Sequence, residues 1–101
     1  MSVRDHEHLR QIAAVKLREL MQLSHDDVIA RPQIIVEQLS DEKIHVTEYH
    51  DVLRNDEHMI VIQAAKPLLG GIFTAIEVDG FVLCSDGSRR ALTEEETWDF
   101  T

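Results

Sequence analysis

The apolar residues of this 101-residue chain change their spacing once, close to residue 33. Before that point they recur every three to four residues, as on one face of an α-helix. After it they come in short runs separated by turn-forming residues, which is typical of β-strands. A long helix followed by consecutive strands predicts an α+β fold in which the helix packs on an antiparallel sheet.

The N-terminal helix has the clearest pattern, and we expect it to span about residues 5–23. No Gly or Pro interrupts it, and most of its residues are good helix formers. Lys16 falls inside the apolar stripe, where its stem is expected to cover apolar surface while its amine reaches water. The alternative is a lysine desolvated beside a functional site. The stripe consists of Leu9, Ile12, Ala13, Leu17, Leu20 and Leu23.

The next segments are a short helix and a series of strands. Ser24, with Asp27 three residues later, predicts a capped helix that ends before Pro32. The segment 33–39 fits either a strand or a helix opened by Pro32. The expected strands are 33–39, 44–52, 58–65, 72–78 and 81–85.

Two local signals shape the C-terminal half. Asp79-Gly80 predicts a two-residue hairpin, because this pair readily adopts the positive φ angles that such a turn needs. Thr93, followed by three glutamates, predicts a capped terminal helix, and we expect Trp98 and Phe100 to dock on the core. The architecture is therefore an N-terminal helix on an antiparallel meander of about four to five strands, with a short C-terminal helix, in one domain over residues 1–101.

Two of the expected strands are apolar without alternation. The runs are Met59-Ile60-Val61-Ile62 and Phe81-Val82-Leu83-Cys84. A half-solvated strand alternates apolar and polar residues, whereas burial on both faces gives a continuous apolar run. One long and two short helices do not easily cover both faces of a sheet. We therefore expect a homodimer, or another partner, to bury the second face.

The formal net charge is −9, and the acidic excess lies after residue 24. An acidic surface repels phosphate backbones, so we expect no nucleic-acid ligand; a basic protein partner would suit it. A helix-turn-helix interpretation of residues 17–31 is disfavoured, since Asp26 and Asp27 would begin the recognition helix. No apolar run approaches the ~18 residues of a membrane span. A charged start and a single cysteine, Cys84, favour a cytoplasmic location.

The best candidate for chemistry lies in the hairpin of segments 44–52 and 58–65. If its turn centres on Asn55, His50 and His58 become diagonal neighbours on one face, with Glu48 two residues further in. Such a Glu-His-His group can bind a metal or transfer protons. The prediction depends on register, because a slip of one residue reverses the faces. The simpler interpretation is a set of polar residues at the rim of the sheet.

Recognisable catalytic and cofactor motifs are missing from the sequence, among them CxxC, HExxH, GxSxG, a Walker loop and GxGxxG. The segment 87–90, Gly-Ser-Arg-Arg, offers anion-binding groups but lacks the strand–loop–helix context of a nucleotide site, so a charged turn is expected. The sequence favours a non-catalytic interaction module such as an adaptor, chaperone or inhibitor, without a cofactor. The alternatives are a small-ligand or metal-binding domain and an enzyme whose site forms at a dimer interface.

Overall fold

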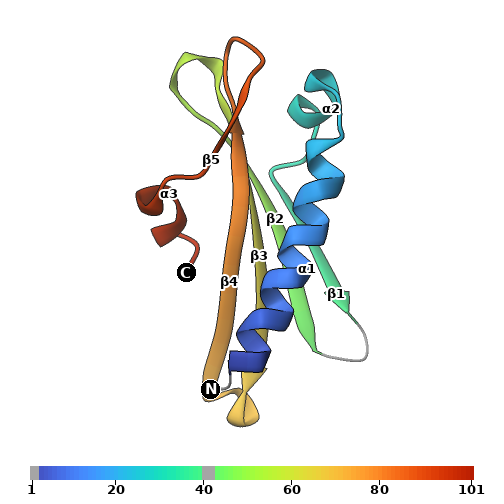
Figure 1. Cartoon of the computed structure of the whole chain (residues 1–101), viewed down its shortest axis with the longest axis vertical. Coiled ribbons are helices and arrows are strands. Elements are labelled where there is room, and N and C mark those ends of the chain that lie inside the picture. The colour runs from blue at the N-terminus through green and yellow to red at the C-terminus, as the bar shows by residue number, and fades with distance from the viewer. Residues whose placement is uncertain (1–2, 40–42) are drawn as a thin grey trace.

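The computed structural model describes residues 3–39 and 43–101 (Figure 1). It confirms the α+β fold, with an N-terminal helix on a five-stranded antiparallel sheet and a short C-terminal helix. The helices are α1 (Val3–Met21), α2 (His25–Ile29) and α3 (Glu94–Trp98). The strands are β1 (Ile34–Leu39), β2 (Ile44–Val52), β3 (His58–Leu68), β4 (Phe73–Leu83) and β5 (Arg89–Ala91).

The sheet is a simple meander in the order β1-β2-β3-β4-β5, and every neighbouring pair is antiparallel. The segment that fitted either a strand or a helix is strand β1, at one edge of this sheet. The second hairpin turns at Asn55, whose φ of 64° is a left-handed conformation that asparagine tolerates. Ser24 caps α2 as expected, its side chain accepting from the backbone N–H of Asp27 at 3.1 Å.

One face of the sheet, here called the inner face, packs against α1, which lies along β3 and β4 (Figure 1). Buried helix residues such as Leu9 and Leu20 meet strand residues such as Ile60 and Phe81. These apolar contacts form the larger of the two clusters found among the described residues, and burial of this kind is the main favourable term in folding. The buried members are Leu9, Ala13, Leu20, Val28, Ile44, Val46, Ile60, Ile62, Ala64, Ala75, Phe81 and Leu83.

The predicted hairpin at Asp79-Gly80 is wrong, because β4 continues through both residues in one unbroken register with β3. A Cβ at position 80 would lie 2.1 Å from the carbonyl oxygen of Ile60 and 2.9 Å from Leu92 Cδ1. Glycine is therefore required for close packing rather than for a positive φ. The Asp79 carboxylate accepts from the Gly80 N–H at 2.8 Å. The true turn comes later and leads into β5, a short strand expected as a charged loop.

The opposite, outer face is partly covered by the chain's own C-terminal segment, on the other side of the sheet from α1 (Figure 1). Leu92 and Phe100 pack on a small cluster formed by Met59, Val61 and Val82. Some of the coverage expected from a second molecule is thus intramolecular. The expectation that both terminal aromatic residues dock is right for Phe100 and wrong for Trp98, which is 65% exposed.

Candidate functional site

A buried ion pair lies on the inner face of the sheet. Glu48, in the middle of β2, is only 1% exposed. Arg31, between α2 and β1, donates from Nε to Oε2 at 2.8 Å and from Nη2 to Oε1 at 2.7 Å. This hydrogen-bonded pairing raises the pKa of Arg31 above its ordinary value. Both oxygens of the carboxylate are therefore occupied by the guanidinium group.

Two histidines continue this polar group toward the end of the sheet. The register places His50 opposite Ile60 and Val52 opposite His58, which confirms the predicted hairpin pairing. His50 Nε2 and His58 Nδ1 are 2.8 Å apart, and His50 Nδ1 lies 2.7 Å from the carbonyl oxygen of Arg31. His50 is only 7% exposed. The polar chain runs without a break from Arg31 through His50 to His58.

When both rings are neutral, the partners of His50 decide their tautomers. A carbonyl oxygen only accepts, so His50 Nδ1 carries the hydrogen and donates a hydrogen bond to the backbone carbonyl oxygen of Arg31. His50 Nε2 is then an acceptor, and His58 Nδ1 donates to it. The lone pair that remains is on His58 Nε2. Desolvation, followed by repulsion from His50 and His25 whenever these carry a proton, lowers the pKa of His58 below its ordinary value.

The candidate metal ligands Glu48, His50 and His58 share one face, as the sequence indicated. The Glu48 carboxylate is bound to Arg31, and both nitrogens of His50 have partners. Within residues 3–39 and 43–101, no group of three or more His, Cys, Asp or Glu side chains is arranged to hold a metal ion. Metal binding by these three residues stays a prediction, and His58 Nε2 is the donor atom that remains for it.

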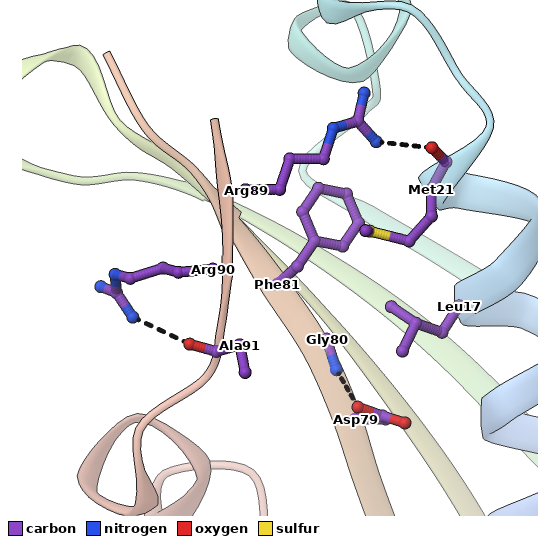
Figure 2. A pocket seen from close by; sticks show the side chains of 8 residues that line it. All are labelled: Leu17, Met21, Asp79, Gly80, Phe81, Arg89, Arg90 and Ala91. Carbon is purple, nitrogen blue, oxygen red and sulfur yellow. Dashed lines mark hydrogen bonds between the residues drawn. The ribbon is translucent and has the colours of Figure 1, made fainter. Parts of the chain in front are cut away.

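The Gly-Ser-Arg-Arg segment, considered above for anion binding, makes internal contacts instead. Arg89 Nη1 donates to the carbonyl oxygen of Met21 at 3.1 Å (Figure 2). Nη1 also donates to the carbonyl oxygen of Leu20 at 3.3 Å, and Nη2 donates to that of Leu23. These carbonyl groups lie at or just beyond the end of α1, and that of Leu20 also accepts from the Leu23 N–H at 3.1 Å. The guanidinium therefore caps the helix and complements its dipole. It also lies over the ring of Phe81, 5.2 Å from the centroid. Sequence reasoning missed this contact.

A shallow groove of about 210 Å³ lies beside Arg89, between the end of α1 and strands β4 and β5 (Figure 2). It is smaller than the ~300 Å³ at which small-molecule pockets begin. Its two arginines already bind other groups of the protein, and its Asp79 carboxylate accepts from Gly80. We interpret it as a packing gap at the end of β5. The lining residues are Leu17, Met21, Asp79, Gly80, Phe81, Arg89, Arg90 and Ala91.

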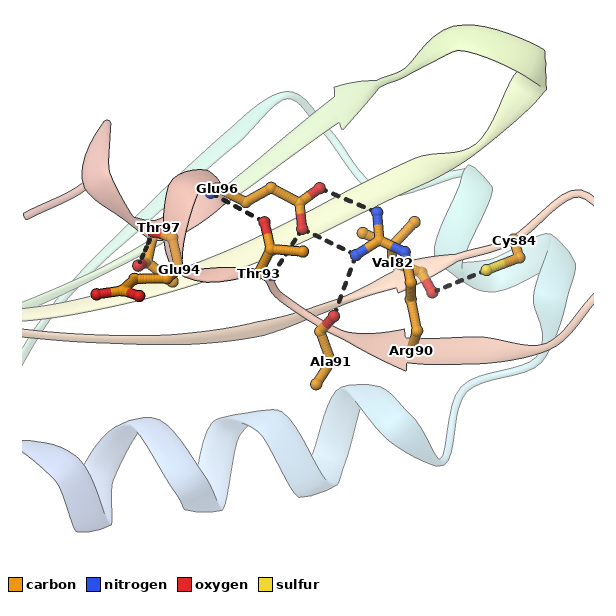
Figure 3. Close-up of polar contacts among 8 residues, drawn as sticks. All are labelled: Val82, Cys84, Arg90, Ala91, Thr93, Glu94, Glu96 and Thr97. Carbon is orange, nitrogen blue, oxygen red and sulfur yellow. Dashed lines mark hydrogen bonds and ion pairs between the residues drawn. The ribbon is translucent and has the colours of Figure 1, made fainter.

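The C-terminal segment is held to β5 by a surface ion pair (Figure 3). Arg90 Nη1 and Nη2 bind the Glu96 carboxylate at 2.8 and 3.1 Å. Thr93 caps α3 as predicted, in a capping box with Glu96. Arg90 is the main reason why the pKa of Glu96 falls to about 2. The Cys84 thiol beside this group lies 3.9 Å from the carbonyl oxygen of Val82.

The outer face is bare at its β1 end. Ile34 and Val36 point to this face and are 58% and 60% exposed. Ile34 lies opposite Tyr49 in the register of β1 and β2. The ring of Tyr49 packs on that of Phe100, with the two centroids 4.9 Å apart. The outer apolar layer therefore extends to β1 without cover there. Sequence reasoning missed this surface, although a run of three β-branched apolar residues at positions 34–36 could have indicated it.

The comparisons with known proteins add no functional information. No protein-family model, curated protein or solved structure matches this chain. Among the described residues, no helix is long and apolar enough to cross a membrane.

Proposed function

We propose that this chain is a small, acidic, non-catalytic protein-interaction module, and that β1 is its docking strand. The observation that carries the proposal is the exposure of Ile34 and Val36, 58% and 60%, on a strand with one neighbour in the sheet. Solvent-exposed apolar residues are common singly, but two on one face of an edge strand mark a place where another chain can add. A cytoplasmic location, with Cys84 as a free thiol, is part of this proposal.

The backbone of β1 supports this role. The N–H of His50 donates to the carbonyl oxygen of Gln33 at 2.9 Å. Because hydrogen-bonding groups alternate along an antiparallel strand, Gln33 and Ile35 turn theirs toward β2, while Ile34 and Val36 turn theirs toward the open edge. An extended partner strand can pair with those outward groups, as in β-strand addition.

Natural edge strands are often protected by lysine, proline or inward-pointing charges. Strand β1 contains no lysine or proline, and its one charged residue is Glu37. The Glu37 carboxylate lies 3.3 Å from Lys16 Nζ, so its charge is already paired. That contact also shows that Lys16 reaches across from α1 to the edge of the sheet. Little in the described part of β1 opposes the approach of a second strand.

The proposal is tested by affinity capture of the tagged full chain from its native host, with quantitative mass spectrometry. The double variant Ile34→Lys/Val36→Lys places charge on the docking strand, and Val15→Lys is the matched control on an exposed position of α1. We expect a stoichiometric partner that the wild type and Val15→Lys retain and the double variant loses. Equal recovery by all three proteins, with equal melting temperatures, would contradict a role for β1.

A ligand-binding or metal-binding domain remains the second candidate because of one observation: His58 contacts His50 through Nδ1, at 2.8 Å, which leaves Nε2 as its other ring nitrogen for a ligand. One imidazole is a weak site, since a stable metal centre needs three or four ligands. Isothermal titration with Zn²⁺, comparing the wild type with His58→Gln, distinguishes the two functions. Binding at micromolar affinity that His58→Gln abolishes would favour this candidate.

A further inference from the structure

We infer that the chain added to β1 is a second copy of this protein, paired antiparallel about a two-fold axis through Ile35. The inference rests on the proposed role of β1 as a docking strand and names its occupant. In this arrangement two five-stranded sheets join edge to edge, and the α1 helices lie on the same side of the combined sheet.

The pleat of the strand limits the possible registers. Residues directly opposite each other share a face of the sheet, so odd-numbered residues of β1 must oppose odd-numbered residues of the copy. An axis through Ile35 sets Ile34 opposite Val36 of the copy. An axis through Val36 would set Ile34 opposite the polar Gln38. An axis through Glu37 would bring two like charges directly together, which is destabilising.

The register through Ile35 uses the groups that β1 leaves open. Ile34 and Val36 direct their backbone groups to the edge. In this register Ile34 of one chain pairs with Val36 of the copy, and each such pair forms two backbone hydrogen bonds. On the outer face, these two exposed side chains and their copies form one apolar patch. The patch continues through Ile34 onto Tyr49 and the aromatic layer of the C-terminal segment. One pairing thus satisfies both the backbone edge and the apolar surface.

The charges of β1 favour a second copy over a basic partner. The chain carries a net charge of −9, but β1 contributes only Glu37, which Lys16 already neutralises. In the inferred register Glu37 lies opposite Gln33 of the copy, whose amide can donate to a carboxylate. A basic segment would find no unpaired carboxylate along this strand. Pro32, which lacks an N–H, lies opposite Gln38 and limits the paired length to residues 33–37.

Cysteine cross-linking of the full chain in a Cys84→Ser background tests the register. Ile35→Cys places the thiol on the axis, where the two Cα atoms are about 4.5 Å apart, within disulfide range. Gln33→Cys is the control, because its copy lies ~13 Å away along the strands. We expect Ile35→Cys to form a covalent dimer on mild oxidation and Gln33→Cys to form less than a tenth as much. Stronger cross-linking by Val36→Cys would overturn the axis through Ile35.

Light scattering after size exclusion tests the second copy without any cysteine. We expect the wild type and Val15→Lys to have twice the 11.6 kDa chain mass at high micromolar concentration, and Ile34→Lys/Val36→Lys to have the mass of one chain. A wild type that stays monomeric throughout would overturn the inference. In that case, β1-dependent capture of a different protein from the host would still support the docking strand. A monomeric wild type that also captures no β1-dependent partner would reject the proposed function as well.

Discussion

The two faces of the sheet are covered in different ways. On the inner face, the 19-residue helix α1 spans β3 and β4 and buries the larger apolar cluster. On the outer face, a short C-terminal segment covers the middle strands and leaves β1 bare. A long helix covers neighbouring strands continuously, whereas a short segment covers only the strands that it reaches. The uncovered strand is therefore the place where this protein has surface left to offer a partner.

The ion pairs of the two faces also differ in how far solvent reaches them. On the inner face, the carboxylate of the Arg31–Glu48 pair is shielded from water. On the outer face, the Arg90–Glu96 pair is accessible to solvent, with Arg90 40% exposed. An ion pair in water contributes little, while breaking a buried one leaves a charge without hydration. We therefore expect changes on the inner face to have larger effects.

The largest effect is expected from Arg31→Met. It leaves the Glu48 carboxylate buried without its partner, which typically costs about 3–5 kcal/mol in the free energy of unfolding. Urea unfolding followed by circular dichroism measures this loss. The double variant Arg31→Met/Glu48→Leu is the control, and we expect it to recover most of the stability because no buried charge remains. A single variant as stable as the wild type would show that the inner face does not depend on this pair.

Gly80→Ala is expected to destabilise the fold by about 3 kcal/mol, because the closest clash of the new Cβ, at 2.1 Å, is with a backbone carbonyl oxygen that cannot move aside. The neighbours it would strike are the Ile60 carbonyl oxygen and Leu92 of the outer layer. Gly87→Ala is a useful comparison, since its Cβ would meet open space and its φ of 90° gives a purely conformational cost. Thermal unfolding of both variants separates packing from conformation. A milder effect at Gly80 than at Gly87 would contradict the packing role.

The two terminal aromatic residues provide a matched pair on the outer face. Phe100→Ala removes the ring that packs on Tyr49, and we expect a loss of about 2 kcal/mol, less than for a fully buried ring. Trp98→Ala removes an exposed ring, and the change in unfolding free energy should stay within about 0.5 kcal/mol. Chemical denaturation of both variants measures the difference. Equal losses would mean that the outer layer is arranged differently.

Thr93→Ala removes the cap of α3, and we expect it to cost about 1 kcal/mol. Because the cap anchors only the C-terminal segment, the loss should appear as faster amide exchange around Phe100 rather than along α1. Hydrogen exchange read by mass spectrometry distinguishes the two patterns. The return of protection in Thr93→Ser, which keeps the capping oxygen, would confirm the role of the hydroxyl.

The smallest effect concerns pH. The pKa of His58 is lowered in the folded state, so the unfolded chain binds its proton more readily. The contribution of His58 to stability is therefore complete above its unfolded pKa of about 6.5 and is lost as the pH falls toward its lower folded pKa. Melting temperatures between pH 8 and pH 5 should decline more steeply for the wild type than for His58→Gln. Parallel curves would contradict the assignment.

Much of the fold could be predicted because its signals are local. The stripe around Leu9 and Leu20 specified the helix, and Ser24 and Thr93 marked the starts of α2 and α3. The turn at Asn55 set the register that brings His50 and His58 together. Each of these features depends on residues close in the chain, whose spacing follows directly from helix or strand geometry.

The rest was decided by contacts between distant segments. Glu48 was predicted on the right face, but its partner Arg31 lies 17 residues earlier, and no short-range pattern joins them. Arg89 caps a helix that ends 68 residues before it. Position 80 requires glycine because Ile60 and Leu92 lie close to it, although an Asp-Gly dipeptide in isolation favours a turn.

The sequence alone determined the elements and one hairpin register, through local backbone and side-chain preferences. Only the tertiary structure decided which charges are paired, which face the C-terminus covers and which strand stays open, because these depend on the packing of the whole chain.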